Sequence, residues 1–366
     1  MATELHDAKT ATRRRFLVRA AALGIAGPVG LVAGKGLALT RVAPPPFDPS
    51  AYPICRAAGT GEAVPAGELK KVTFAWNAGA PCLLAITVAK DMGFFAKHGL
   101  DVDLVNYAGS TDQLLETLAT GKADAAVGMA LRWLKPMEQG FDVKIVASLH
   151  GGCMRLLAPT DSGVNTVVDL KGKIIGVSDM NSPAKNFFAI VIRKAGLDPT
   201  TDVEFKQFPA PLLRAAVDKG EAHAVADGDP NTYLWLKDGK LKEISSNLTG
   251  EYANRVCCII GVRGSLVRDD KRTAASIALA LLDAAEYAAQ NPADAAATYA
   301  PFAPGSVSSA DLTALAKYHT HHHHPMGEDL KKEIAAYAEE LKLVSVFKPS
   351  LDTAKYADRV YADVLS

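Results

Sequence analysis

Short apolar runs alternate with longer amphipathic segments along most of the chain from Leu69 onward. The runs at 71–76, 101–107, 123–128 and 143–149 have the length and composition of β-strands. Two helices are expected between them, at 83–97 and 110–120, and the second opens with Ser110 followed by Gln113 three residues later, a helix-start pattern. Strands that alternate with helices predict an α/β fold with mostly parallel sheets.

The same alternation recurs in the second half of the chain. Strands are expected at 174–178, 203–208 and 222–226, with helices at 182–195 and 210–219. A phrase made of a helix end, a glycine and a short apolar strand occurs twice, as TGKADAAV at 120–127 and as KGEAHAVA at 219–226. The repetition predicts two similar α/β lobes. The run CCIIGV at 257–262 is expected to return the chain to the first lobe, and an Ala-rich helical region follows Arg272.

The N-terminal segment has the layout of an export signal. Arg13, Arg14 and Arg15 precede Phe16 and Leu17, and a short apolar stretch rich in Ala and Gly follows at 20–33. We therefore expect residues 1–40 to be a signal resembling the twin-arginine type. An ordinary secretory signal and a retained N-terminal anchor are the alternatives. Residues 41–68 are rich in Pro and Gly and are expected to form a linker.

The charge balance excludes some classes of partner. The chain has 40 basic and 40 acidic residues, so no net field attracts it to nucleic acid. The first 40 residues hold 6 basic and 2 acidic residues, which leaves 34 against 38, or a net charge of −4, in the remainder. A basic N-terminal segment followed by a mildly acidic remainder of the chain favours the interpretation of an exported protein.

From about Lys70 to the end, the chain resembles a known family. The similarity rests on the order of several phrases, which are AKDMGFFAKHGL at 89–100, GSTDQ at 109–113, LATGKAD at 118–124 and DLKGKIIGV at 169–177. These phrases are similar to those of the substrate-binding proteins of nitrate, sulfonate and taurine-type ABC importers. That family shares its superfamily with the pyrimidine-precursor synthases of thiamine biosynthesis.

The resemblance implies a type II periplasmic-binding-protein fold with a hinge between two lobes. Residues 69–153 and 257–366 would form lobe one, and residues 154–256 would form lobe two. It further implies a periplasmic monomer without enzymatic activity that captures a sulfonate, nitrate or related oxyanion and delivers it to the membrane permease of an ABC importer. One alternative is a periplasmic receptor for a metal or metal complex. Another is an enzyme related to the thiamine-precursor synthases, although Ile259 and Ile260 interrupt the Cys-rich motif that those enzymes require.

Ligands of open α/β sheets bind beyond the carboxyl ends of the strands, where helix N-termini also favour anions. The residues expected there as ligand-binding candidates are Trp76, Asn77, Cys82, Ser110, Thr111, Met129, His150, Ser178, Asn181, Ser182, Asp227 and Asp229. Simpler roles remain open for several of them. The serines could only cap helices, Trp76 could lie in the core, and the two aspartates could only shape a turn. Arg132 is the nearby cation that could pair with an anion, or a surface residue.

The cysteines and histidines depart from the pattern of the resembled family. No cofactor is expected, but soft thiolates and imidazoles would suit copper or zinc, and the candidate metal ligands are Cys82, Cys153, Cys258, His319 and His323. His319 and His323 would share one face if their segment were helical. Small buried thiols and disulfides are the alternatives for the cysteines. For the histidine run at 319–324, the alternatives are a solvated loop and a packing or partner contact.

Overall fold

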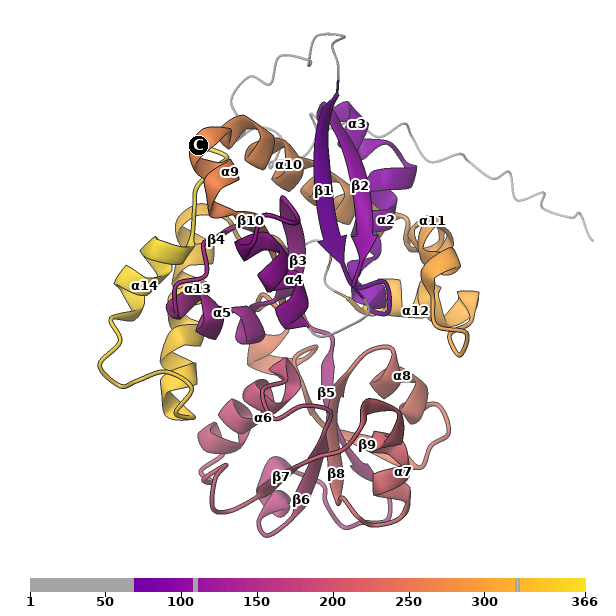
Figure 1. Cartoon of the computed structure of the whole chain (residues 1–366). Coiled ribbons are helices and arrows are strands. Elements are labelled where there is room, and N and C mark those ends of the chain that lie inside the picture. The colour runs from indigo at the N-terminus through magenta and orange to yellow at the C-terminus, as the bar shows by residue number, and fades with distance from the viewer. Residues whose placement is uncertain (1–68, 108–110, 320, 322) are drawn as a thin grey trace, which may run out of the picture. The chain divides into compact units, whose positions relative to one another are not determined.

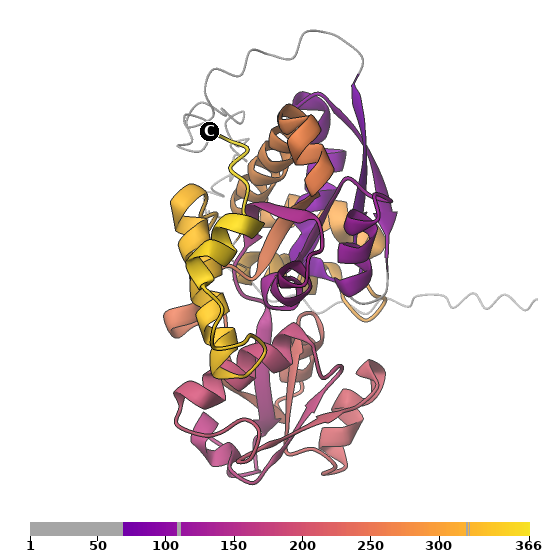
Figure 2. The same ribbon diagram turned by 60° about the vertical axis from the view of Figure 1, so that its left-hand side comes forward.

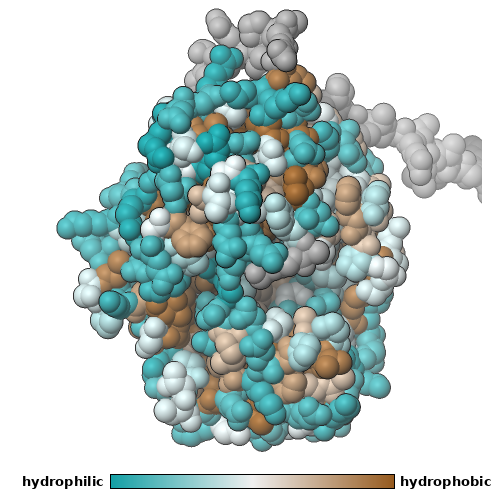
Figure 3. Space-filling view, in the orientation of Figure 1, coloured by the Kyte–Doolittle hydropathy of each residue, from teal (hydrophilic) through white to brown (hydrophobic). Residues whose placement is uncertain are grey.

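The computed structural model describes residues 69–107, 111–319, 321 and 323–366. The expected export signal, the linker and Ser110 lie outside these residues. All described residues belong to a single compact unit. No helix within the described ranges is long and apolar enough to cross a membrane. The face seen in Figure 3 is mostly hydrophilic, with hydrophobic residues in separate small groups.

Five strands form the first sheet, in the order β2-β1-β3-β10-β4. Their bounds are Lys70–Trp76 (β1), Leu100–Asn106 (β2), Ala125–Met129 (β3), Val143–His150 (β4) and Cys258–Arg263 (β10). Strand β1 pairs in parallel with β2 and β3, whereas β10 is antiparallel to both β3 and β4. The chain therefore returns to this sheet through β10, as the apolar run at 257–262 predicts.

The second sheet repeats this plan, in the order β7-β6-β8-β5-β9. Its strands are Met154–Pro159 (β5), Ile174–Val177 (β6), Glu204–Gln207 (β7), Ala224–Gly228 (β8) and Leu241–Ser246 (β9). Here β6 is parallel to β7 and β8, while β5 is antiparallel to β8 and β9. The α/β fold class is confirmed. Both sheets are mixed, because β10 in the first and β5 in the second run opposite to the other four strands. The other four strands of each sheet share one direction, as the expectation of mostly parallel sheets requires.

Helices surround both sheets (Figure 1). The α-helices are Leu84–Asp91 (α2), Phe94–Lys97 (α3), Thr111–Ala119 (α4), Ala130–Glu138 (α5), Pro183–Lys194 (α6), Leu213–Asp218 (α7), Asn231–Leu236 (α8), Gly264–Asp269 (α9), Lys271–Gln290 (α10), Pro292–Tyr299 (α11), Ser309–Tyr318 (α12), Gly327–Leu343 (α13) and Thr353–Val360 (α14). Short 3-10 turns occur at Pro81–Leu83 (η2), Val167–Leu170 (η3), Ala210–Leu212 (η4), Gly250–Tyr252 (η5) and Ala300–Phe302 (η6). The helix expected at 83–97 is divided at Gly93, whose φ of 77° favours glycine.

The chain crosses between the two sheets twice, and the crossings lie against each other. The first joins β4 to β5 at 151–153, and the second joins β9 to β10 at 247–257. Asn247 Oδ1 accepts a hydrogen bond of 2.7 Å from the Met154 amide, and His150 O accepts one of 3.0 Å from the Cys257 amide. These bonds tie both crossings into one junction. The expected lobe boundaries at 153/154 and 256/257 stay a prediction.

The C-terminal helices cover one side of the molecule (Figure 2). Helix α13 packs against α5, which follows a strand of the first sheet, and also against α6, which follows a strand of the second. Glu340 on α13 accepts a hydrogen bond of 2.7 Å from Lys194 on α6. Arg255, in the second crossing, also donates to Glu340, over 3.3 Å. Helix α13 therefore contacts both halves of the fold and the junction between them.

Candidate functional site

A cavity of about 290 Å³ lies where the carboxyl ends of strands from both sheets meet. Its volume is near the lower end of the range for small-molecule sites. The residues that line it are Asn77, Ala80, Cys82, Met129, Arg132, Cys153, Met154, Ser178, Asp179, Ser182, Pro183, Ala184, Asp227, Gly228 and Asp229. Asn77 and Met129 belong to the strand ends of the first sheet, and Ser178 and Asp227 to those of the second. The strand-end argument therefore indicates the place of the cavity correctly.

The structure divides the twelve predicted ligand-binding residues into three groups. Those that line the cavity are Asn77, Cys82, Met129, Ser178, Ser182, Asp227 and Asp229. Those that lie elsewhere are Trp76, His150 and Asn181. Ser110 is outside the described residues, and Thr111 begins α4. Whether any of them binds a ligand stays a prediction.

Trp76 has the packing role that the sequence left open for it. Its side chain is buried, and its ring centroid lies 5.0 Å from Phe302 and 6.4 Å from Tyr299, both in edge-on contact. Ser182 caps α6, since its hydroxyl accepts a hydrogen bond of 3.1 Å from the Lys185 amide. The cap holds the N-terminus of this helix, with Pro183 in its first turn, at the wall of the cavity.

Arg132 is a partly buried cation of the cavity wall. It follows β3 on α5, and its Nε donates to Asp112 Oδ1 over 2.6 Å. Its Nη2 donates to both Asp112 and Asp179, the latter over 3.1 Å. The third nitrogen, Nη1, is buried and has no hydrogen-bond partner among the described residues. Since a buried donor without a partner is costly, Nη1 is suited to donate to an acceptor atom of a bound solute.

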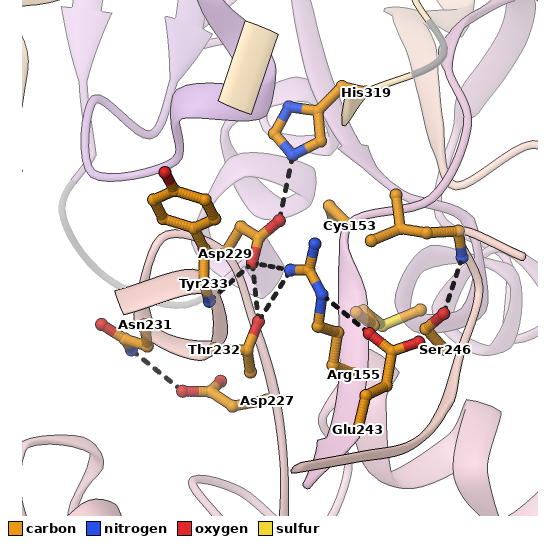
Figure 4. A network of polar contacts seen from close by, with 12 residues as sticks. Cys153, Arg155, Asp227, Asp229, Asn231, Thr232, Tyr233, Glu243, Ser246 and His319 are labelled. Carbon is orange, nitrogen blue, oxygen red and sulfur yellow. Dashed lines mark hydrogen bonds and ion pairs between the residues drawn. The ribbon is translucent and has the colours of Figure 1, made fainter. Parts of the chain in front are cut away.

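The opposite part of the wall is acidic (Figure 4). Asp229 Oδ1 accepts from Arg155 and, over 2.6 Å, from the Thr232 hydroxyl, while Oδ2 lies 3.2 Å from His319 Nε2. Burial alone would raise the pKa of Asp229, but the hydrogen bond and charge of His319 and the charge of Arg155 lower it below its usual value. Asp229 is therefore an ionised carboxylate held inside the fold.

Asp227 has the opposite protonation tendency. Burial raises its pKa above the usual value, and the hydrogen bond of 2.9 Å from Asn231 Nδ2 offsets this only in part. Sequence reasoning considered only a turn or a ligand contact for the two aspartates, and it missed Asp179 altogether. A carboxylate directly after Ser178, at the end of a strand, was the signal that could have identified it.

Four cysteines and three histidines form a buried group behind this wall. We call it the cysteine–histidine cluster, and its members are Cys82, His150, Cys153, Cys257, Cys258, His319 and His321. Ligand atoms of Cys82, His150 and Cys258 all lie within 4.8 Å of one another. The Sγ atoms of Cys153 and Cys257 are 3.7 Å apart. The ring of His150 lies 6.0 Å from that of His319 and 5.8 Å from that of His321.

Side chains of the cysteine–histidine cluster shift one another's pKa values. Hydrogen bonds from Cys153 and Cys258 lower the pKa of the Cys82 thiol well below its usual value, although burial opposes this. Burial lowers the pKa of His150, but the charge of Cys82 outweighs it and raises this pKa to about 9. A thiolate at Cys82 next to an imidazolium at His150 is therefore the favoured state near neutral pH.

The structure corrects two expectations for the histidine run. Helix α12 ends at Tyr318, so His319 and His323 do not share a helical face. His319 and His321 are buried in the cluster, which contradicts a solvated loop. His323 lies apart from them, with Nε2 at 3.6 Å from Glu333. The four described cysteines are free thiols, because 3.7 Å between Cys153 and Cys257 far exceeds a disulfide bond of about 2.05 Å.

Comparisons with known proteins place this geometry in context. The alkanesulfonate-binding protein SsuA from Xanthomonas axonopodis pv. citri is 20% identical, with a TM-score of 0.66 over 80% of this chain and 99% of that one. The periplasmic nitrate-binding protein NrtA from Synechocystis PCC 6803 is 15% identical, with a TM-score of 0.66 over 81% of this chain and 87% of that one. The chain therefore has the periplasmic-binding-protein fold that its sequence predicts.

The chain is also similar in sequence to proteins named for nitrate import and bicarbonate transport. The nitrate import ATP-binding protein NrtC from Synechocystis is 25% identical over 222 residues, which are 55% of this chain. The chain spans about a third of the length of the curated relatives that it matches. A family model described as "NMT1/THI5 like" matches residues 81–295, more than half of the chain. The chain belongs to the NMT1/THI5-like family, whose fold it shares with the sulfonate- and nitrate-binding proteins above.

Proposed function

We propose that this protein is an exported solute-binding protein of an ABC importer, which captures a small solute between its two sheets and delivers it to the membrane permease. The observation that carries the proposal is the cavity, because strand ends and helix starts of both sheets line it. A solute there would contact both halves of the fold at once, so binding would favour a closed arrangement about the two crossings. No chemical step is required of the protein in this role.

The charges around the cavity suggest which solute fits. Arg132 Nη1 and the start of α6 offer donors and positive potential to an oxyanion group. The described lining residues also include Asp179 and the ionised Asp229, so these carboxyl groups outnumber the guanidinium of Arg132 even without Asp227. A bare anion such as nitrate would therefore be less favoured than a solute that carries an oxyanion at one end and a cation at the other. We propose an aminosulfonate or a similar zwitterion as the ligand class.

Thermal unfolding of the full chain with matched solutes tests this proposal. Taurine and isethionate both carry a sulfonate and differ in an ammonium or a hydroxyl at the other end, and nitrate has the oxyanion alone. We expect taurine to stabilise the protein, by about 2.7 kcal/mol at 100 times its Kd. Stabilisation by nitrate or isethionate but not by taurine would refute the zwitterion class. No stabilisation by any organic or oxyanionic solute in a wider panel would refute the solute-binding role.

Substitution of Arg132 tests the donor assignment. In Arg132→Gln the guanidinium is lost, so we expect the solute-dependent stabilisation to fall by about half or more at the same solute concentration, as loss of a hydrogen bond to a charged group costs about 1.5–3 kcal/mol. Lys135→Gln is the matched control, since Lys135 is on the same helix, pairs with Glu138 over 2.7 Å and does not line the cavity. Equal shifts in wild type and Arg132→Gln would show that Arg132 does not contact the solute.

A further inference from the structure

We propose that Cys82, Cys258 and His150 bind a thiophilic d10 metal ion, zinc(II) or copper(I), at the junction of the two crossings. The ion would be a resident part of the protein, separate from the solute. The inference does not depend on the proposed solute, because these three donors bind the ion without it. It starts from the donor atoms of the three residues, which lie within 4.8 Å of one another.

The donor set has the chemistry of a soft-metal site. Two thiolates and one imidazole are ligands that zinc(II) and copper(I) prefer, whereas harder cations prefer carboxylates. Metal–sulfur bonds of about 2.3 Å and metal–nitrogen bonds of about 2.0–2.1 Å would place neighbouring donors less than about 4 Å apart. The present spacing is close enough for an ion to draw the three side chains together with small rotations. On binding, the proton on His150 Nε2 and that of any thiol still protonated would pass to solvent, and no redox change is needed.

The hydrogen bonding of His150 supports the assignment independently. Its Nδ1 lies 2.7 Å from the carbonyl oxygen of Gly151, so Nδ1–H donates to that oxygen. This bond orients the ring and occupies Nδ1, which leaves Nε2 as the nitrogen available to an ion. Nε2 is buried and has no hydrogen-bond partner within the part of the chain that the structure describes. A backbone bond to one imidazole nitrogen, with the other free for an ion, is the usual arrangement of a metal-binding histidine.

Other members of the cluster would surround the ion. Both ring nitrogens of His321 and Nδ1 of His319 are buried without a hydrogen-bond partner in the described ranges. Both rings lie next to that of His150, and imidazole nitrogens are themselves ligands that zinc(II) and copper(I) accept. Without an ion, these unsatisfied nitrogens are costly to bury.

The three proposed ligands lie in the loop after β1 and at the strand ends next to the two crossings. Cys82 lies in η2 after β1, His150 ends β4 just before the first crossing, and Cys258 begins β10 just after the second. An ion there would join the first strand's loop to both crossings. Cys82 also lines the solute cavity, so the ion would lie directly behind the wall that contacts the solute.

Metal titration of the full chain, reduced and freed of metal by a chelator, tests the proposal. We expect about one zinc(II), or one copper(I) under anaerobic conditions, per chain, and competition with chelators separates the two ions. Cobalt(II) in place of zinc(II) should give a thiolate-to-cobalt charge-transfer band in the wild type, a readout that needs no variant. Absence of stoichiometric binding of either ion by the reduced, folded chain would overturn the proposal.

Variants then test the ligand set. Cys82→Ser, Cys258→Ser and His150→Gln should each weaken binding by more than about 100-fold, beyond the range for loss of an outer partner. Cys257→Ser is the matched control, because Cys257 is an equally buried neighbour in the chain but is not in the set of three donors. It should weaken binding by about 10–100-fold at most. Circular dichroism confirms that each variant is folded. An equal loss in Cys257→Ser would refute this ligand set.

Discussion

Replacing Arg155 with methionine is expected to lower the free energy of unfolding by about 3–5 kcal/mol, the cost of leaving one partner of a buried ion pair alone. Arg155 and Asp229 pair with side chains that are 5% and 0% exposed. Arg155 also donates to the Thr232 hydroxyl over 3.2 Å and to Glu243 over 3.1 Å. Its removal would leave the Asp229 carboxylate with fewer charge partners in a dry environment. Chemical denaturation of the wild type and the variant measures the difference.

Two further variants test whether the expected loss of stability comes from the burial of the ion pair or from the loss of a charge alone. Arg268→Met removes an arginine that likewise pairs with a carboxylate, here through two bonds to Asp142, but both of these side chains are at least half exposed. It should cost at most about 1 kcal/mol. In the double variant Arg155→Met, Asp229→Leu, neither partner of this ion pair is left alone, so part of the stability should return. A loss below 1 kcal/mol in Arg155→Met would contradict the importance of this pair.

The second large effect is expected at Gly152, where the two crossings touch. A Cβ at this position would lie 2.0 Å from the backbone oxygen of Asn247 and 2.6 Å from its side-chain oxygen. Because one obstacle is backbone, Gly152→Ala must separate the crossings, and overpacking of this kind costs about 1–3 kcal/mol or more. We also expect a weaker thermal shift with solute, because the junction sets the spacing of the cavity walls. Denaturation and solute-dependent melting measure the two effects.

Gly305→Ala is the matched control for this substitution. A Cβ there would meet no heavy atom within 4 Å, and its φ lies outside the left-handed region. The same change should therefore leave the stability within about 0.5 kcal/mol of the wild type. If Gly152→Ala behaved like Gly305→Ala in both measurements, the contact between the crossings would not control the cavity.

The order and type of most elements follow from local patterns in the sequence. Apolar runs of strand length identify β1, β2, β3, β4 and β6, and the repeated phrase at 120–127 and 219–226 indicates two sheets of the same plan. The place of the cavity is also predictable, because residues directly after strands of an α/β sheet lie at its carboxyl edge. Asn77, Ser178 and Asp227 were found in this way.

Other features could not be read from local patterns. Strands β5 and β9 were not predicted. The reversed place of β5 between β8 and β9 depends on the first crossing and on pairing between distant segments. Trp76 looks like a pocket residue by its position after a strand, but α11 and η6, more than 200 residues later, bring Tyr299 and Phe302 against it. The partners of a buried ring depend on packing between elements, which the sequence does not display.

The candidate metal site was also predictable from the sequence only in part. The sequence by itself determined that soft donors occur at strand ends and near the expected crossings, which was enough to include Cys82 and Cys258 among the metal candidates. Only the tertiary structure decided that His150 joins them and that His323 does not. The reason is physical: donors that are far apart in the chain become neighbours only through the register of β4 and β10, where Cys258 pairs with His150. Such a register is fixed by the packing of a whole sheet, whereas the periodicity of a strand is fixed by its own residues.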